Sequence, residues 1–291
     1  MTDSGRPSRR VAVVGDVGGH VDELRRELRR LGADPATGWL PDDLAVVQVG
    51  DLVHRGPDSE RVVALVDGYL REQPGQWVQL VGNHEAHYLR EPVFEWPERI
   101  SRESVRTLRR WWETGQLRVA ASVVTDTETF LITHAGLTSG FWREVLGSPV
   151  DGREAEAVLN GLIGRNDAAL FRAGHMLSGK RRSRGAGPIW AAAATELVPS
   201  WLGEPMPFSQ IHGHSGIYDW HRGHFRASEA IARMTSLDVG TRHQTVGLPG
   251  GRIVGIDPGH GQQAAHSWRA YELRGTLPAA GAPSSTADPH S

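Results

Sequence analysis

The chain of 291 residues contains no cysteine and a single lysine, Lys180. Without a thiol, it cannot form disulfide bonds, use a cysteine nucleophile or hold a metal ion through thiolates. The same absence leaves the cellular compartment open. All other basic residues are arginines, and no arginine run dominates one segment. We therefore interpret the shortage of lysine as a bias of genomic composition.

Strong net charge and long apolar runs are also missing. The formal net charge is -2 at pH 7, which does not favour nucleic acid or a membrane surface as a partner. No apolar stretch is long enough to cross a bilayer. The polar segment 1–10 lacks the apolar centre of a secretory signal. We therefore expect a cytoplasmic protein with no nucleic-acid or membrane partner.

The length allows one large domain or two small ones. Residues 1–10 are polar, and residues 276–291 are rich in Pro, Ala and Ser, so both ends are predicted to be disordered. Neither a long linker nor an internal repeat interrupts the chain between them. We predict a single domain over residues 11–275.

Short apolar runs alternate with helical patterns along the first third of the chain. Residues 11–14, 44–49 and 77–81 predict buried strands. Between them, 21–31 and 61–70 have the apolar spacing of helices. Further helices are predicted at 104–112, 141–146 and 154–163, and further strands at 130–133, 208–211, 235–239, 252–256 and 268–273. The pattern favours an α/β fold of two stacked mixed β-sheets flanked by helices.

Five of the predicted strands end in side chains that can bind metal: Asp16, Asp51, Asn83, His134 and His214. Ligands of layered α/β folds bind where the carboxyl ends of strands open into loops. Carboxylate, amide oxygen and imidazole together suit Mn, Fe or Zn better than Ca or Mg alone. Each residue alone has a simpler explanation, such as a turn, a helix cap or a hydrogen-bonded histidine. It is their ordered recurrence that favours a metal site.

The order of these blocks resembles the calcineurin-like metallophosphoesterases, and within them the phosphoprotein-phosphatase and diadenosine tetraphosphatase branch. The resemblance covers roughly residues 11–256. It rests on Gly15–Gly19, Gly50–Gly56, Gly82–Glu85, His134–Leu137, Gly213–Ser215 and Asp238–Gly240. The third and fourth blocks match the family pattern fully. They are specific for the superfamily and much less so for a substrate.

The resemblance implies a centre of two divalent metal ions, Mn, Fe or Zn. By analogy, Asp51 bridges both ions, and Asp16 belongs to the first site. Asn83, His134 and His214 complete the second site. A bridging carboxylate and two ions would form a clamp for in-line attack on phosphorus by water.

The resemblance also implies a function. His84 is expected to protonate the leaving oxygen, and Arg55 to hold the phosphate through paired N–H donors. We expect a phosphomonoesterase whose substrate is a phosphorylated protein, at phosphoserine or phosphothreonine, or a small phosphate ester. One alternative is a hydrolase of dinucleoside polyphosphates or nucleotides. The other is a regulatory protein that binds phosphate without turnover.

Two positions depart from the family pattern. Gly18 replaces the histidine of the first block, which removes one expected ligand of the first metal. His20, His54 or His212 could replace it, the first site could be weak, or turnover could be lost. We prefer an ordinary role in the first turn of the following helix for His20.

The second departure is His54, which stands where the family has the aspartate that orients the catalytic histidine. An imidazole can donate or accept a hydrogen bond there, but it supplies no negative charge to favour a protonated His84. In the phosphoprotein-phosphatase branch, a further phosphate-binding arginine usually lies between the fourth and fifth blocks. Arg181, Arg182 and Arg184 are candidates, although a solvated basic loop is the simpler interpretation.

Overall fold

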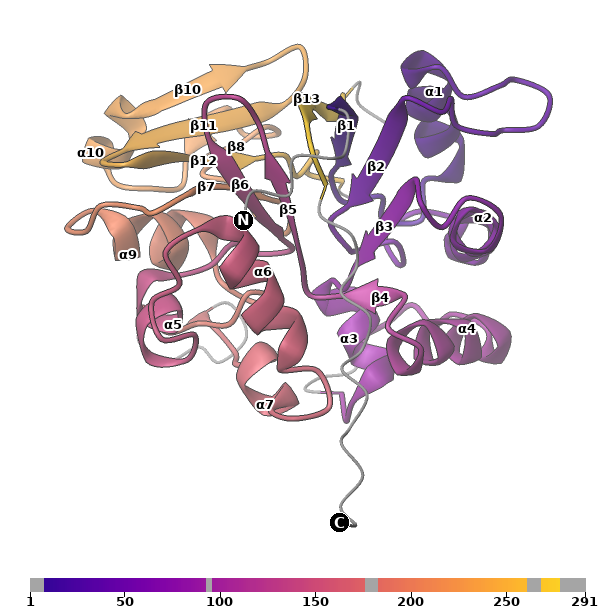
Figure 1. Cartoon of the computed structure of the whole chain (residues 1–291), viewed down its shortest axis with the longest axis horizontal. Coiled ribbons are helices and arrows are strands. Elements are labelled where there is room, and N and C mark those ends of the chain that lie inside the picture. The colour runs from indigo at the N-terminus through magenta and orange to yellow at the C-terminus, as the bar shows by residue number, and fades with distance from the viewer. Residues whose placement is uncertain (1–7, 93–95, 176–182, 261–267, 278–291) are drawn as a thin grey trace.

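A computed structural model describes residues 8–92, 96–175, 183–260 and 268–277. Two large β-sheets face each other at the centre, and helices cover their outer faces (Figure 1). This arrangement confirms the prediction of an α/β fold with two stacked mixed sheets between helices. Within the described residues, no helix is long and apolar enough to cross a membrane.

The first sheet carries the N-terminal third of the chain. Its strands are β1 (Arg9–Val14), β2 (Leu44–Gln48), β3 (Trp77–Leu80), β4 (Leu117–Arg118) and β13 (Tyr271–Gly275). The spatial order is β13-β1-β2-β3-β4. All neighbours pair in parallel except β13, which runs antiparallel to β1. The carboxyl ends of β1, β2 and β3 therefore lie at one edge of the sheet.

The second sheet combines strands from the middle and the end of the chain. They are β5 (Ala120–Val124), β6 (Thr129–Thr133), β7 (Ser209–His212), β10 (Thr235–Asp238), β11 (His243–Leu248) and β12 (Gly251–Gly255). The order is β10-β11-β12-β7-β6-β5, and β12, β7 and β6 run parallel to one another. A small hairpin of β8 (Tyr218–Asp219) and β9 (His224–Phe225) lies apart.

Helices form the outer layers. The larger ones are α1 (Val21–Leu31), α2 (Ser59–Glu72), α4 (Arg102–Glu113) and α6 (Gly152–Gly161). The shorter ones are α3 (Asn83–Leu89), α5 (Ser139–Glu144), α7 (Asp167–Leu170), a π-helical turn at Ala193–Leu197, α9 (Val198–Trp201) and α10 (Glu229–Arg233). Helices α1 and α2 lie beside the first sheet and α6 beside β5 and β6 of the second (Figure 1).

The period-2 alternation of strand residues explains the layers. Val11 and Val13 of β1 pack with residues of the second sheet such as Ile132 and Ile211, between the two sheets. Ala12 and Val14 point the other way and join the core formed with the helices. β1 is thus buried on both faces, as its continuous apolar run predicts.

Strand pairing extends into both segments that were predicted to be disordered. β1 begins at Arg9, inside the segment expected to be disordered, because the backbones of Arg9 and Arg10 pair with β13. Thr276 likewise pairs with Val124. The rest of the predicted disordered ends, 1–7 and 278–291, lies outside the described residues. The single domain over 11–275 stays a prediction.

Candidate metal centre

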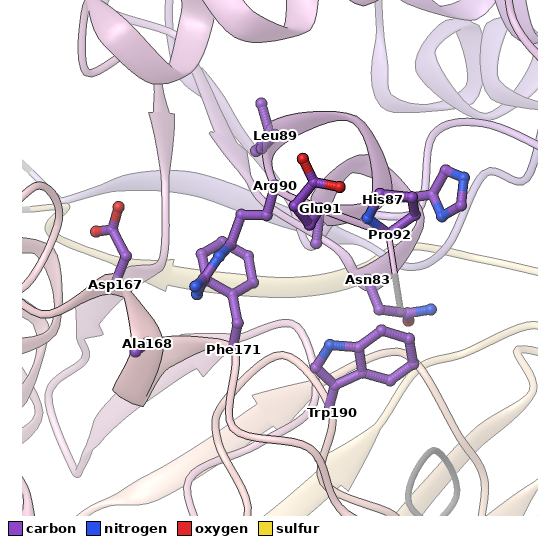
Figure 2. Close-up of a pocket in the computed structure, with 11 residues that line it drawn as sticks. Asn83, His87, Leu89, Arg90, Glu91, Pro92, Asp167, Ala168, Phe171 and Trp190 are labelled. Atoms are coloured by element: carbon purple, nitrogen blue, oxygen red, sulfur yellow. The ribbon is translucent and has the colours of Figure 1, made fainter. Parts of the chain in front are cut away.

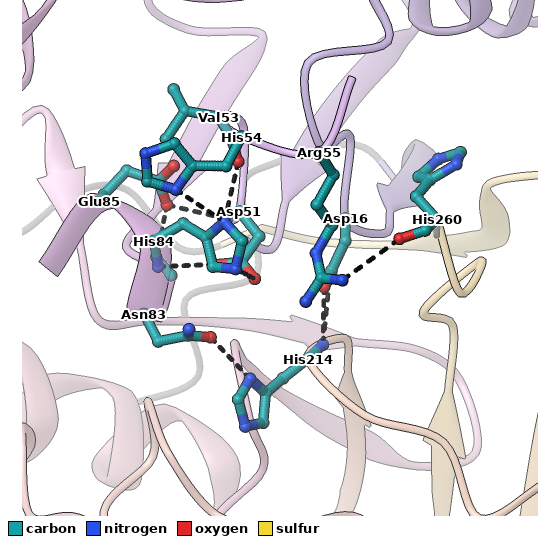
Figure 3. Close-up of polar contacts among 12 residues, drawn as sticks. Asp16, Asp51, Val53, His54, Arg55, Asn83, His84, Glu85, His214 and His260 are labelled. Atoms are coloured by element: carbon teal, nitrogen blue, oxygen red, sulfur yellow. Dashed lines mark hydrogen bonds and ion pairs between the residues drawn. The ribbon is translucent and has the colours of Figure 1, made fainter. Parts of the chain in front are cut away.

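Residues from four separate strand ends converge at the edge where the carboxyl ends of β2, β3, β6 and β7 meet. Atoms of Asp51, His134 and His214 that can bind a metal lie within 4.8 Å of one another. The Oδ1 atom of Asn83 lies 3.0 Å from His134 Nε2 and 2.7 Å from His214 Nδ1. Figure 3 shows the Asn83 side chain pointing toward His214. The four residues expected at the second metal site are thus brought together.

The donor atoms of this cluster fit a cation. His134 Nδ1 lies 3.0 Å from the carbonyl oxygen of Val49, and a carbonyl can only accept, so Nδ1 carries the proton. Nε2 of His134 therefore presents a lone pair to Asn83 Oδ1 and, at 3.4 Å, to Asp51 Oδ1. Three acceptors that face one another in a buried place repel unless a positive charge lies between them.

The ionisation states agree with metal binding. Burial lowers the pKa of His134 and His214, so that both are neutral imidazoles at neutral pH. Burial would raise the pKa of Asp51, but the neighbouring histidines His84, His134 and His214 offset this, and it lies below its ordinary value. Neutral imidazole and ionised carboxylate are the forms that bind metal.

Glu85 has a structural role that the sequence did not reveal. Its buried carboxylate accepts hydrogen bonds from the backbone N–H groups of Asp51 (2.8 Å), Leu52 (2.8 Å) and Gly82 (2.9 Å). Burial and the repulsion of Asp51 raise the pKa of Glu85 to about 7. The side chain ties the loop after β2 to the start of α3. It thereby fixes Asp51 relative to Asn83.

Close backbone packing explains two of the glycines in the blocks. A Cβ atom at Gly82 would lie 2.2 Å from Asp51 Oδ1, and one at Gly213 would lie 2.1 Å from Asp16 Oδ1. Both positions therefore exclude any side chain. Asp51, His54, Arg55 and His214 have positive φ angles, between 55° and 71°. Such strained backbone is typical of functional sites.

His84 lies beside the cluster and is held at both ring nitrogens. Its Nδ1 is 2.9 Å from the carbonyl oxygen of Val53, so Nδ1 carries a proton there. Its Nε2 faces Asp51 Oδ2 at 3.6 Å. The only nitrogen that can exchange a proton with a ligand is therefore Nε2, which is the orientation a general acid needs.

His54 occupies the place of an orienting residue. Its Nδ1 lies 3.1 Å from Nδ1 of His84, and its Nε2 lies 2.5 Å from the hydroxyl of Tyr88. The Trp96 ring stacks on His54 at 5.2 Å. Burial and the nearby His84 lower the pKa of His54 to about 3, so it is neutral at pH 7. Because His84 Nδ1 donates, His54 Nδ1 accepts and His54 Nε2–H donates to Tyr88.

Asp16 is close to the cluster, but its carboxylate forms hydrogen bonds to a backbone N–H group. Both of its carboxylate oxygens accept from the backbone N–H of His214, at 3.0 and 3.1 Å. Its pKa lies well above the ordinary value because it is buried and because Asp257 and Asp51 repel its negative charge. Asp257, which follows β12, was not identified from the sequence. Asp16 as a ligand of the first metal remains a prediction.

Arg55 reaches toward Asp16 from the loop after β2 (Figure 3). Its side chain is exposed. It lies 5.7 Å from the Trp96 ring and 3.5 Å from the carbonyl oxygen of His260. An exposed guanidinium beside this group of metal-binding side chains is available to bind a phosphate. Of the other candidate arginines, Arg181 and Arg182 lie outside the described residues, and Arg184 is exposed.

The candidates for replacing the missing histidine do not join the cluster within the described part of the chain. His20 faces Glu23 at 3.9 Å and packs against the His260 ring at 4.6 Å, near the first turn of α1. His212 places Nδ1 2.8 Å from the carbonyl oxygen of Gly213. His54 contacts His84 instead. His20 directly precedes α1, and its ordinary role stays a prediction.

Gly18→His should add a ligand to the first metal site. A Cβ atom at Gly18 would lie 3.6 Å from its nearest neighbours, so there is space. The φ angle of 52° costs a non-glycine residue roughly 1–2 kcal/mol. We expect a rise in bound metal per chain and in turnover, measured by mass spectrometry of the metal and by phosphate release. Gly18→Ala has the same backbone cost without the ligand. Equal values for both variants would refute an underliganded first site.

His212→Gln should flatten the acid dependence of stability. Burial lowers the pKa of His212 to about 4, whereas an unfolded histidine has about 6.5. Between these values the unfolded chain binds a proton that the folded chain does not. The free energy of unfolding therefore decreases as pH falls through this window, by about 3 kcal/mol. Urea unfolding of chelated protein at pH 7 and pH 4.5 measures the difference. His224→Gln, at an exposed histidine, is the control. An unchanged pH dependence in His212→Gln would contradict a neutral buried His212.

The structure corrects the match of Asp238 to the family pattern. Asp238, matched to the Asp-x-Gly strand, is exposed at the end of the outer strand β10, and its carboxylate accepts from the backbone N–H groups of Gly240 and Thr241. Asp257 of Asp257-Pro258-Gly259 lies close enough to raise the pKa of Asp16. Both segments contain Asp-x-Gly, so the sequence alone did not separate the outer strand from the central one.

Comparison with known proteins agrees with the fold and with the cluster of metal-binding residues. The chain matches the family described as calcineurin-like phosphoesterase over residues 9–235 and belongs to it. That family uses divalent metals, and its members hydrolyse phosphate esters.

Similar proteins have several activities. Serine/threonine-protein phosphatase 1 of Salmonella typhimurium is 44% identical over 78 residues, 26% of this chain and 30% of that protein. The symmetrical bis(5'-nucleosyl)-tetraphosphatase of Aeromonas hydrophila is 40% identical over 78 residues, which are 26% of this chain and 24% of that protein. A zinc-dependent endopolyphosphatase of Saccharomyces cerevisiae is 35% identical over 72 residues, which are 25% of this chain and 19% of that protein. The chain thus spans less than a third of the length of these relatives.

Proposed function

We propose that the protein hydrolyses phosphate monoesters at a metal centre held by Asp51, Asn83, His134 and His214, with Asp16 at a weaker first site. The observation that carries the proposal is the convergence of Asp51, His134 and His214 within 4.8 Å, beside His84, whose Nε2 faces Asp51 Oδ2 at 3.6 Å. Mn, Fe or Zn suit this mixed set of nitrogen and oxygen ligands.

Each residue around the metal centre has a separate role in this reaction. Divalent metal, when bound, polarises the phosphate oxygens and lowers the pKa of water so that it can attack phosphorus. Arg55 holds non-bridging phosphate oxygens through its N–H groups and offsets the charge that grows on them. His84, protonated at Nε2, gives that proton to the leaving oxygen. His54 and the Val53 carbonyl keep the ring of His84 in place through Nδ1.

Phosphoserine or phosphothreonine in a protein is one substrate of this kind, and the similarity to a serine/threonine-protein phosphatase over 78 residues supports it. A second candidate is a nucleotide or dinucleoside polyphosphate. The likeness to tetraphosphatases supports it, and so does a cavity that adjoins Asn83.

A substrate panel tests the proposal. Protein loaded with Mn²⁺ is assayed with p-nitrophenyl phosphate, phosphoserine and phosphothreonine peptides and diadenosine tetraphosphate, with and without a chelator. We expect phosphate release from monoesters that chelation abolishes. Metal-loaded protein that binds phosphate but turns over no member of the panel would favour a non-catalytic phosphate-binding protein instead.

A further inference from the structure

A cavity of about 520 Å³ adjoins the metal centre at Asn83. Its walls come from α3 and the residues after it, from α7 and Phe171, and from Trp190 (Figure 2). The volume lies within the range of about 300–1,000 Å³ that is typical of pockets for small molecules. A phosphate alone would fill only a fraction of it. The cavity is therefore available to the group that the phosphate is attached to.

Helix α3 extends from the metal centre along the cavity. Asn83, His87 and Arg90 line the cavity and are spaced i, i+4 and i+7, so they share one side of the helix and its C-terminal cap. His84, which is positioned to protonate the leaving oxygen, lies on the same first turn. A group attached to a phosphate near Asn83 can extend along this side of α3 into the cavity.

Planar groups form two of the cavity walls. The guanidinium carbon of Arg90 lies 4.8 Å from the centre of the Phe171 ring, and Figure 2 shows Arg90 extended over that ring. Trp190 also lines the cavity and contacts the ring of His214 edge to face, at 6.0 Å and 87°. Guanidinium planes and indole rings both stack on nucleobases.

We propose that this cavity holds the base of a nucleotide substrate, stacked on the Arg90–Phe171 pair and on Trp190, while its phosphate lies at the metal centre. The inference rests on the proposed phosphatase function. A serine or threonine leaving group is small and aliphatic and makes no use of these walls. A tyrosine ring is planar but fills less of the volume.

Two carboxylates of the cavity lining can bind the sugar or the base. Asp167 lies at the end away from Asn83 (Figure 2), and Glu91 is a second carboxylate in the lining. Carboxylates accept hydrogen bonds from ribose hydroxyls and exocyclic amines and repel phosphate. Asp167 can thus bind the sugar or the base at the end of the cavity away from Asn83.

Arg90→Ala tests the proposal with two substrates that differ only in the base. AMP and ribose 5-phosphate have the same 5′-oxygen as leaving atom, so their ratio of kcat/KM isolates the contribution of the base. We expect wild-type protein to prefer AMP, and the variant to lose about tenfold of that preference. Arg106→Ala, at an exposed arginine of α4 outside the cavity, should keep it. Calorimetry with adenosine should show about tenfold weaker binding to Arg90→Ala.

The results separate this inference from the proposed function. If wild-type protein releases phosphate from both substrates at equal kcat/KM, or if Arg90→Ala lowers both equally, the cavity does not select a base. If a phosphotyrosine peptide is preferred over its phosphoserine counterpart and only that preference depends on Arg90, the cavity binds tyrosine and the nucleotide assignment is wrong. If no phosphate ester is hydrolysed at all, the proposed function fails, whereas adenosine binding still tests the cavity.

Discussion

Asp51→Asn should abolish metal retention and lower turnover by at least about 10³-fold. The substitution keeps the shape of the side chain and removes one negative charge from the centre of the cluster. Asp51 approaches His134 and His84 at 3.4 and 3.6 Å, and no other carboxylate joins the described group of ligand atoms. Loss of the several kcal/mol that a metal ion contributes to the transition state corresponds to this factor.

The experiment measures bound metal per chain after gel filtration, together with phosphate release from p-nitrophenyl phosphate. Asp238→Asn serves as the matched control, because Asp238 is exposed and lies on the outer strand β10. It should retain wild-type metal content and turnover. Retained metal and activity in Asp51→Asn would show that its carboxylate does not bind the metal.

His84→Ala should lower turnover by about 10²–10⁴-fold while metal content stays near the wild-type value. His84 is outside the group formed by Asp51, His134 and His214, and proton donation to the leaving oxygen is worth this factor. The loss should be larger for phosphoserine than for p-nitrophenyl phosphate, because nitrophenolate leaves without needing a proton.

His224→Ala, at an exposed histidine, controls for the loss of an imidazole. Metal content and the two substrates are measured on the same preparations. If His84→Ala loses metal together with activity, His84 is a ligand and its assignment as general acid is wrong. An equal loss for both substrates would show that proton transfer is not its role.

Much of the fold and of the candidate site could be predicted because both depend on local patterns. Continuous apolar runs predicted β1, β2 and β3, which are buried on both faces. A polar residue directly after such a run lies at the carboxyl end of a strand. Parallel pairing brings those ends to one edge, so Asp51 and Asn83 meet although they are distant in sequence.

What the sequence did not reveal depends on contacts between distant segments. Glu85 forms hydrogen bonds to the backbone N–H groups of Asp51 and Leu52, which no local pattern specifies. Asp257 is one of two aspartates followed by x-Gly, and only the sheet order distinguishes the central β12 from the outer β10. The cavity walls combine Arg90, Phe171 and Trp190 from three segments. Tertiary packing rather than local propensity decides each of these.

His54 shows what the sequence could and could not predict about a single residue. The sequence indicated that it could orient His84 without supplying a charge. Its contacts with His84 and Tyr88 define which nitrogen donates. The direction of the hydrogen bonds follows from the carbonyl of Val53, a backbone atom that carries no sequence signal.

Calorimetric titration of Mn²⁺ into metal-stripped protein tests most directly whether one cation is shared by these separate strand ends. Wild-type protein should bind at least one ion per chain, and His134→Ala and His214→Ala should each lose that binding. His212→Ala, two residues from His214, should bind as the wild type does. Wild-type protein that takes up no metal, or either of the first two variants binding Mn²⁺ with wild-type affinity, would contradict the account.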